Sequence, residues 1–316
     1  MSVLDPAGPQ SAEIAHVWDV FLWVTAIVWV LVIAFFIVSM WMSKKNVPAH
    51  PMAENADRDR RLTRGIAIAG GATVLTLLGL LFVSVHAGSQ LAALENDADA
   101  INIRITGKQW WWQVDYEPTD PAQAVTTANE IHVPVGKLVH LELTSADVIH
   151  SFWVPSVHGK RDLIPGRMNR TWIRVDEPGV YRGQCAEFCG LEHAEMSLRI
   201  VAEPFDKYQA WLNHQREPAA PPVTPEQQRG LALFLGSPCA MCHAVAGTPA
   251  GGRLGPDLTH VASRDTLGAG ALPNTTNAMT QWVANAQAFK PGTHMPAVGY
   301  SEADLNALVA FLEALQ

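Results

Sequence analysis

The sequence predicts a multidomain membrane protein, in which a pair of membrane-spanning helices precedes an all-β sandwich and a smaller all-α domain. Three observations carry this prediction. Two long uncharged apolar runs lie in the first third of the 316-residue chain. Apolar and polar residues then alternate with a period of two, and beyond a proline-rich segment the apolar period becomes helical.

The membrane spans are predicted from the two apolar runs. Phe21 to Met42 and Gly65 to Leu94 contain no Asp, Glu, Lys or Arg, and the second run is most apolar from Ile66 to Val85. At about 1.5 Å per residue, each run can cross a hydrocarbon core of about 30 Å. A buried core helix would rarely be so long, so we predict spans at about 20–42 and 66–88 within a hairpin region of residues 1–95.

The charges beside the spans predict their orientation. No Lys or Arg precedes the first span, and no basic segment of a cleaved signal peptide is recognisable there. Acidic residues follow the second span: Glu95, Asp97 and Asp99. The loop between the spans is basic, with Lys44, Lys45, Arg58, Arg60, Arg61 and Arg64. The positive-inside rule therefore places this loop in the cytoplasm, and both termini on the periplasmic or extracellular side of a bacterial inner membrane.

Charge also limits the classes of partner. The net charge of −8 argues against a nucleic-acid partner, which would require a basic face. It suits a basic partner, and a small basic electron carrier is one candidate.

The exported part divides into a β domain, predicted over 96–205, a linker over 206–224 and a helical domain over 225–316. Alternating residues predict antiparallel strands in a sandwich or barrel. The prolines of Arg216 to Pro225 favour an extended spacer. The strand residues are Ile101, Ile103, Ile105, Val139, Leu141, Leu143, Thr171, Ile173, Val175, Met196, Leu198 and Ile200.

Two helices of the last domain have predicted start signals. Thr224, Pro225 and Gln227 fit an N-cap, a first-turn proline and a capping-box partner. Ser301 and Asp304 fit the start of a second helix. Its apolar stripe is expected to face a core and consists of Leu305, Leu308, Val309 and Leu312.

The first cysteine pair lies in a segment with the ligand chemistry of copper. The segment GQCAEFCGLEHAEM contains Cys185, Cys189, His193 and Met196, and His150 stands earlier in VIHSFWVP. Thiolate, imidazole and thioether form a soft donor set that suits copper. A disulfide between the cysteines is an alternative, but it leaves His193 and Met196 unexplained. Zinc would have no use for the methionine.

The second cysteine pair lies in a haem-attachment motif. CAMCH spans Cys239, Cys242 and His243, and this pattern is typical of covalent c-type haem. Met295 in the downstream segment KPGTHMP is the candidate distal ligand, and a thioether opposite histidine raises the haem potential.

Residues 12–203 resemble subunit II of cytochrome c oxidase, which carries a dinuclear copper centre named CuA. The resemblance rests on HSFWVPSVHGKRDLIPG, CAEFCGLEHAEM and GKQWWWQ. It implies a cupredoxin-like sandwich, a Glu187 side chain that helps to hold magnesium or manganese shared with subunit I, and Trp110 at the surface where electrons are received. The implied CuA ligands are the bridging thiolates Cys185 and Cys189, the capping His150 and His193, the weak axial Met196 and the carbonyl of Glu187.

Residues 225–316 resemble class I cytochrome c, and LGPDLTHVA resembles the loop whose proline flanks the proximal histidine. The combination resembles oxidases of the caa type. It implies a membrane-bound subunit beside subunits I and III, with electrons passing from a soluble cytochrome or a membrane complex to haem c, then to CuA and the haem of subunit I. There oxygen is reduced to water and protons are pumped, so this chain itself is expected to hold no catalytic residue.

Two other functions remain open from the sequence. A copper-delivery or assembly protein would need neither the covalent haem nor the complete bridging set. The electron-accepting subunit of a CuA-containing nitric oxide reductase would share the copper motif, although the two-helix anchor and HSFWVP favour the oxygen-reducing enzyme. A quinol oxidase subunit is excluded because it would lack the copper ligands.

Overall fold

The computed structural model describes residues 4–43, 56–95, 100–117 and 120–316. The chain divides into two compact units. One contains Met1–Ser11 together with Asp97–Gln316, and the other is Ala12–Asn96.

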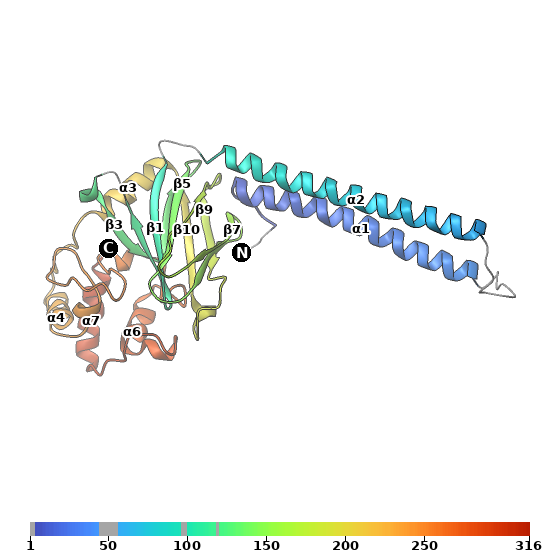
Figure 1. Ribbon diagram of the computed structural model, residues 1–316. Helices are drawn as coiled ribbons and strands as arrows, with labels where there is room; N and C mark the ends of the chain where they lie inside the picture. The colour runs from blue at the N-terminus through green and yellow to red at the C-terminus, as the bar shows by residue number, and fades with distance from the viewer. Residues whose placement is uncertain (1–3, 44–55, 96–99, 118–119) are drawn as a thin grey trace. The chain divides into compact units, whose positions relative to one another are not determined.

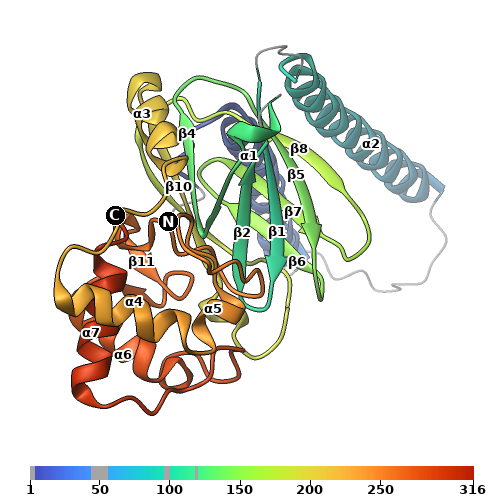
Figure 2. The same ribbon diagram turned by 90° about the vertical axis from the view of Figure 1, so that its left-hand side faces the viewer.

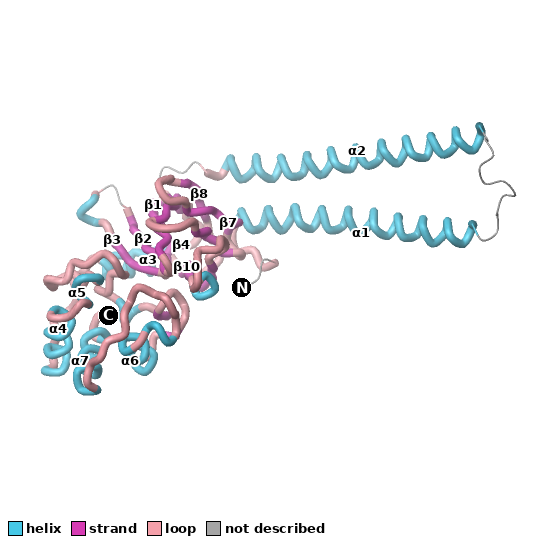
Figure 3. Tube along the Cα trace, turned by 60° about the horizontal axis from the view of Figure 1, so that its bottom comes forward, coloured by secondary structure: helices cyan, strands magenta, loops and turns pink. Residues whose placement is uncertain are grey.

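The second unit is formed by two long helices, α1 (Pro9–Ser43) and α2 (Ala56–Ala93), which run in opposite directions (Figures 1 and 3). Both are long and apolar enough to cross a membrane, with mean hydropathies of 2.9 and 2.3 in their most apolar stretches. They extend beyond the predicted spans, because the charged segment from Asp57 to Arg64 continues the helix of α2. The predicted loop residues Lys44 and Lys45, and also Asp97 and Asp99, lie outside the described residues.

The predicted β sandwich is confirmed. Its larger sheet has the strand order β3-β2-β1-β5-β8, its second sheet the order β4-β10-β9, and β6 and β7 form a separate pair. The strands are β1 (Ile101–Lys108), β2 (Trp111–Tyr116), β3 (Val125–Ala128), β4 (Glu130–Pro134), β5 (Val139–Ser145), β6 (His150–Val154), β7 (His158–Leu163), β8 (Asn169–Ile173), β9 (Gly179–Gln184) and β10 (Ser197–Glu203).

Most of the alternating residues of the predicted strands are buried in the core, and Ile101 is partly buried. Ile105, Leu141 and Ile200 are fully buried, and burying a large aliphatic side chain contributes about 1.5–3 kcal/mol. The expected antiparallel pairing holds for most neighbouring strands but not for two pairs. Strand β1 pairs in parallel with β5, and β4 in parallel with β10. The period-two pattern reports which face of a strand is buried, whereas the direction of its partner depends on the path of the chain between them.

Part of the expected linker is helical. Helix α3 (Phe205–Gln215) occupies its first half, before the prolines. Tyr208 and Leu212, four residues apart, are buried, and Trp211 stacks on His132 of β4 with ring centroids 4.0 Å apart. The extended spacer is therefore shorter than the sequence suggested.

The C-terminal domain is helical, as predicted, and contains one short hairpin (Figures 2 and 3). The predicted capping box at Thr224 is present, and the Ser301 hydroxyl accepts from the amide of Asp304. The elements are α4 (Pro225–Leu235), α5 (Cys239–Cys242), β11 (Thr266–Leu267), β12 (Leu272–Pro273), α6 (Thr276–Ala284) and α7 (Glu302–Glu313). Short 3-10 turns lie at Pro121–Gln123, His193–Glu195, Val261–Ser263 and Ala286–Ala288.

Helix α4 crosses α7 at a point of close backbone approach. A Cβ atom added to Gly230 would lie 2.0 Å from the carbonyl oxygen of Ala307. Phe234 of α4 and Phe311 of α7 are buried beside this crossing, with ring centroids 5.7 Å apart. The crossing thus fixes the position of α4, which leads directly into the Cys239 segment.

Candidate metal and haem sites

The two cysteine sulfurs of the first pair lie next to each other but are not bonded. Cys185 follows strand β9 and Cys189 lies in the next loop; both are buried. Their sulfurs are 3.8 Å apart, far beyond the roughly 2.05 Å of a disulfide. Two thiols held this close and facing each other can bridge metal ions.

Each of these sulfurs faces one imidazole nitrogen and one weaker donor. For Cys185 these are Nδ1 of His150 at 3.9 Å and the carbonyl of Glu187 at 3.3 Å. For Cys189 they are Nδ1 of His193 at 3.6 Å and the sulfur of Met196 at 3.8 Å. The structure thus brings all six predicted copper ligands into one cluster, in which His150, Met196 and both cysteines are buried and Glu187 and His193 are partly exposed.

The surrounding strands hold this cluster in place. His150 is the first residue of β6, and a Cβ atom at Gly107 would lie 2.7 Å from its ring, so only glycine fits there. The amide of Cys185 donates to the carbonyl of Met196, which ties both ends of the cysteine loop together. Donors that are fixed by strands in this way need little rearrangement to hold a metal.

Asp147 orients His150 and was missed in the sequence analysis. It interacts with Nε2 of His150 at 2.8 Å and accepts from the amides of Gln109 and Val148 at 2.6 and 2.7 Å. Because Nε2 is engaged, Nδ1 is turned towards the sulfur. The available signal was a carboxylate three residues before a candidate ligand histidine.

Protonation of the two thiols is shared between them. The hydrogen bond with Cys189 lowers the pKa of Cys185 to about 3, whereas the adjacent Cys185 thiolate raises the pKa of Cys189. Burial lowers the pKa of His150, but its contacts with Asp147 and Cys185 outweigh burial and raise that pKa. Metal binding must therefore displace protons from Cys189 and from His150.

The donor set fits a pair of coppers. It is buried, sulfur-rich and completed by imidazoles, and a thioether is a ligand that copper accepts and zinc structural sites do not use. A subset of three, His150, Cys185 and Cys189, has ligand atoms within 4.8 Å of one another.

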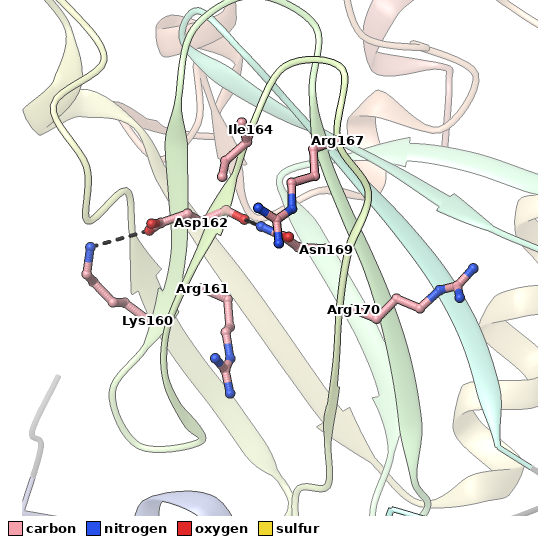
Figure 4. Close-up of a pocket in the computed structure, with 7 residues that line it drawn as sticks. All are labelled: Lys160, Arg161, Asp162, Ile164, Arg167, Asn169 and Arg170. Carbon is pink, nitrogen blue, oxygen red and sulfur yellow. Dashed lines mark hydrogen bonds and ion pairs between the residues drawn. The ribbon is translucent and has the colours of Figure 1, made fainter.

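The two predicted roles of Glu187 use different parts of the residue. Its carbonyl faces Cys185, whereas its carboxylate is 44% exposed and pairs with Lys160 at 3.1 Å. Lys160 also lines an open pocket of about 320 Å³ on β7 and β8 (Figure 4). Four cationic side chains and one carboxylate gather there: Lys160, Arg161, Arg167, Arg170 and Asp162.

Trp110 does not lie at the surface, in contrast to the expectation. Only 7% of it is exposed, because Gly292 and Lys290 of the C-terminal domain lie against it. Its indole Nε1 donates to the carbonyl of Cys189 at 3.0 Å. Neighbouring Trp111 lies under the Lys108 ammonium at 4.7 Å, and Trp112 is buried in the sheet.

The haem motif lies on a single helical turn followed by an extended residue. Cys239 and Cys242 begin and end α5, and His243 follows directly. Nδ1 of His243 donates to the carbonyl of Pro256 at 2.7 Å, which leaves Nε2 as the nitrogen available to iron. Burial lowers the pKa of His243 and so favours the neutral, ligating ring. These residues fit a covalent haem.

Hydrogen bonds from the side chain of Gln287 hold the loop that contains Met295, the candidate distal ligand. Gln287 donates through its amide nitrogen to the carbonyls of Thr293 and Met295, at 2.5 and 2.8 Å. Met295 itself is half-buried. Met279, which had no ligand context in the sequence, is buried in the core of the domain.

Comparisons with known proteins identify the family of each domain. Residues 117–203 match the family model of the cytochrome c oxidase subunit II periplasmic domain, and residues 227–316 match that of cytochrome c. Cytochrome c oxidase subunit 2 of Alkalihalophilus pseudofirmus is 33% identical, with 100% of this chain and 91% of that protein covered. The corresponding subunit of Bacillus sp. (strain PS3) is 31% identical, with 70% and 64% covered.

Among solved structures, the periplasmic domain of subunit II of the Bradyrhizobium japonicum cytochrome oxidase is 34% identical. That comparison covers 39% of this chain and 96% of the other, with a TM-score of 0.36.

Two helices of membrane-spanning length, a copper-type donor cluster and a cytochrome c domain together define the class of haem-copper oxidase subunits that carry a fused cytochrome c domain. This chain belongs to the cytochrome c oxidase subunit II family, with a cytochrome c domain fused to its C-terminus. It is therefore a membrane protein and one subunit of a larger enzyme, and its two domains imply CuA and haem c.

Proposed function

We propose that this chain receives electrons for a proton-pumping oxidase of the caa type. Electrons from an external donor enter at a haem held by Cys239, Cys242 and His243, with Met295 as the distal ligand. They pass to a dinuclear copper centre and then to the haem of subunit I, where oxygen is reduced to water. The proposed copper ligands are His150, Cys185, Glu187 (through its carbonyl), Cys189, His193 and Met196.

The paired surroundings of the two sulfurs are the observation that carries this proposal. Each thiol faces one imidazole and one weaker donor, with distances of 3.3–3.9 Å around a buried centre. When bound, the copper pair and the haem iron supply one-electron chemistry. The protein keeps water away from the sulfurs, orients the His150 imidazole through Asp147 and fixes the cysteine loop.

The exposed side of the same loop is the proposed contact with subunit I. The Glu187 carboxylate would help to hold magnesium or manganese there after releasing Lys160. The cationic pocket beside it would contact anionic groups of the neighbouring subunits. This arrangement requires both domains to lie on the periplasmic or extracellular side, as the basic loop between the spans suggests.

The alternatives are less well supported. A copper-delivery protein has no use for a haem motif whose histidine is already oriented by Pro256. A nitric oxide reductase subunit would share the copper motif, and identification of the co-purifying catalytic subunit distinguishes it from an oxygen-reducing oxidase.

The test is the copper-to-iron ratio of the full chain, matured in cells that attach c-type haem. We expect about two coppers per covalent haem iron, as in a dinuclear site. Cys185→Ser should lose the copper and keep the haem. A wild-type ratio of one copper or fewer would contradict the dinuclear assignment.

A further inference from the structure

A buried lysine joins the cytochrome c domain to the copper domain. Lys290 follows the 3-10 turn Ala286–Ala288 and is only 2% exposed. Its ammonium donates to the carbonyl of Trp110 at 2.7 Å and to that of Gly268 at 2.8 Å. One cation therefore links the β1–β2 connection, the hairpin β11–β12 and the loop that leads to Met295.

Hydrogen bonds continue from this lysine to the copper loop. Trp110, whose carbonyl accepts from Lys290, donates through its indole to the carbonyl of Cys189. Gln109 donates to the same carbonyl at 2.7 Å. The backbone of a proposed copper ligand is thus two hydrogen bonds away from a side chain of the cytochrome c domain.

Further polar contacts surround Lys290 at this interface. The buried Glu130 carboxylate accepts from the amides of Asp265 and Thr266, at 2.9 and 3.3 Å. Ser197 donates through both its amide and its hydroxyl to the carbonyl of Ala269. Arg199 pairs with Asp265 at 2.9 Å nearer the rim. Glu130, Ser197 and Arg199 of the β domain therefore hold the β11–β12 hairpin and the residue before it, which fixes the position of the hairpin against that domain.

The charge on Lys290 is retained inside this contact. Burial lowers its pKa to about 8, while the nearby carboxylates of Glu192 and Glu195 raise it. At neutral pH it remains an ammonium, with two fixed carbonyls as acceptors. A buried cation of this kind is costly unless its partners are exactly placed, so it favours one docked arrangement over others.

We propose that Lys290 is the positioning residue for electron transfer between the two sites of this chain, because it fixes the cytochrome c domain against Trp110 and the Cys189 loop. The inference rests on the proposed function. In the step concerned, one electron leaves the reduced haem iron and reduces the copper pair, with no proton transferred by Lys290 itself.

The direct test compares Lys290→Met with Lys108→Met in the full chain loaded with copper and haem. Lys108 also joins the domains, through the carbonyl of Arg253 at 3.2 Å, but it does so at the exposed rim. Hydrogen exchange of the Ser197, Asp265 and Thr266 amides reports how often the interface opens. We expect it to accelerate about tenfold or more in Lys290→Met, because two buried carbonyls lose their donor, and less than about threefold in Lys108→Met.

The second measurement is the rate of copper reduction after flash reduction of the haem. It should fall in Lys290→Met while the haem and copper absorption spectra, and the rate of haem reduction by an artificial donor, stay unchanged. A purely structural role would not separate these quantities. Unchanged amide exchange and an unchanged internal rate in Lys290→Met would overturn the proposal.

Failure of the proposed function and failure of the role of Lys290 give different results. If the wild-type haem passes no electron to copper, the proposed function fails, whereas the exchange result still decides whether Lys290 holds the domains together. If Lys290→Met unfolds the domain, amides of the α7 core will also exchange rapidly. Lys290→Gln, which retains two N–H donors for the same carbonyls, then decides: interface exchange close to the wild-type rate in a folded variant supports the proposal, and interface exchange that is faster despite the retained donors opposes it.

Discussion

At the scale of single residues, the geometry of the donor cluster depends on Asp147, which is not one of the proposed copper ligands. Asp147 holds His150 through one carboxylate oxygen and is itself held by two backbone amides. Neutralising it should let the imidazole rotate away from Cys185. The side chain thus influences how tightly the cluster retains its metal.

We predict that Asp147→Asn weakens copper retention by about 10- to 100-fold, the usual effect of removing the partner of a ligand histidine. Competition with a copper chelator measures this. Asp162→Asn is the matched control, since Asp162 contacts Lys160 and not the donor cluster. Equal retention in both variants would show that Asp147 does not orient the ligand.

A second residue links stability to pH. His158 donates through Nδ1 to the carbonyl of Gly159 and accepts at Nε2 from Thr171, so its neutral form is fully bonded. Burial lowers its pKa below the usual 6.5. The unfolded state therefore binds a proton more readily, and stability must fall as the pH falls below about 6.5.

We expect His158→Gln to reduce the decrease in the free energy of unfolding with falling pH, by up to about 1.4 kcal/mol per pH unit. Urea unfolding of the copper-free protein, followed by tryptophan fluorescence between pH 7 and pH 5, measures it. A pH dependence that is identical in the variant and the wild type would refute this role for His158.

Residue types predicted the donor cluster but not its surroundings. Few functions other than copper binding need two thiols, two imidazoles and a thioether together, so this combination is distinctive in the sequence. The residues are His150, Cys185, Cys189, His193 and Met196. Asp147 and Lys290 are ordinary charged residues in the sequence. Their importance follows from partners that only the folded chain brings close, in the case of Lys290 a carbonyl 180 residues away.

At the scale of elements, local signals predicted most of the fold. The capping box at Thr224 and the alternation within β5 depend on neighbours a few residues apart, which the sequence displays directly. Helix α3 was missed because the nearby prolines dominated the composition. The parallel pairing of β1 with β5 could not be read, because it depends on how intervening strands are arranged.

The crossing of α4 and α7 supports an element-scale prediction. Gly230→Ala should destabilise the cytochrome c domain by about 1–3 kcal/mol, because its Cβ would meet the backbone of Ala307. Gly251→Ala is the control, since an added Cβ there meets no atom within 4 Å. Thermal unfolding followed at the haem absorbance should separate the two variants. Similar midpoints would mean that the crossing can widen without cost.

At the scale of the whole molecule, the C-terminal domain covers the tryptophan that the resemblance placed at an open surface. Trp110 is buried beneath Gly292 and Lys290. Under the proposed function, an external donor would therefore meet the cytochrome c domain and not Trp110, and electrons would reach the copper site from within the chain.

This arrangement predicts two different responses to salt. With a basic soluble donor, the rate of haem reduction should fall by tenfold or more from low to about 0.5 M salt, because the chain carries a net charge of −8 and steering is screened. The internal rate should change by less than about twofold, since the domains are already in contact. Stopped-flow and flash photolysis measure the two rates. An internal rate that falls in parallel with haem reduction would indicate that the domains separate and rejoin in each turnover.

The burial of Trp110 beneath the C-terminal domain also bears on the kinetic order expected for copper reduction. A donor that is part of the same chain is present at a fixed effective concentration, whatever the supply of diffusible carriers. Under the proposed function, copper reduction would then be first-order, and only the haem would compete for carriers in solution. Dilution of the donor pool would slow the filling of the haem without altering how rapidly a stored electron moves inward.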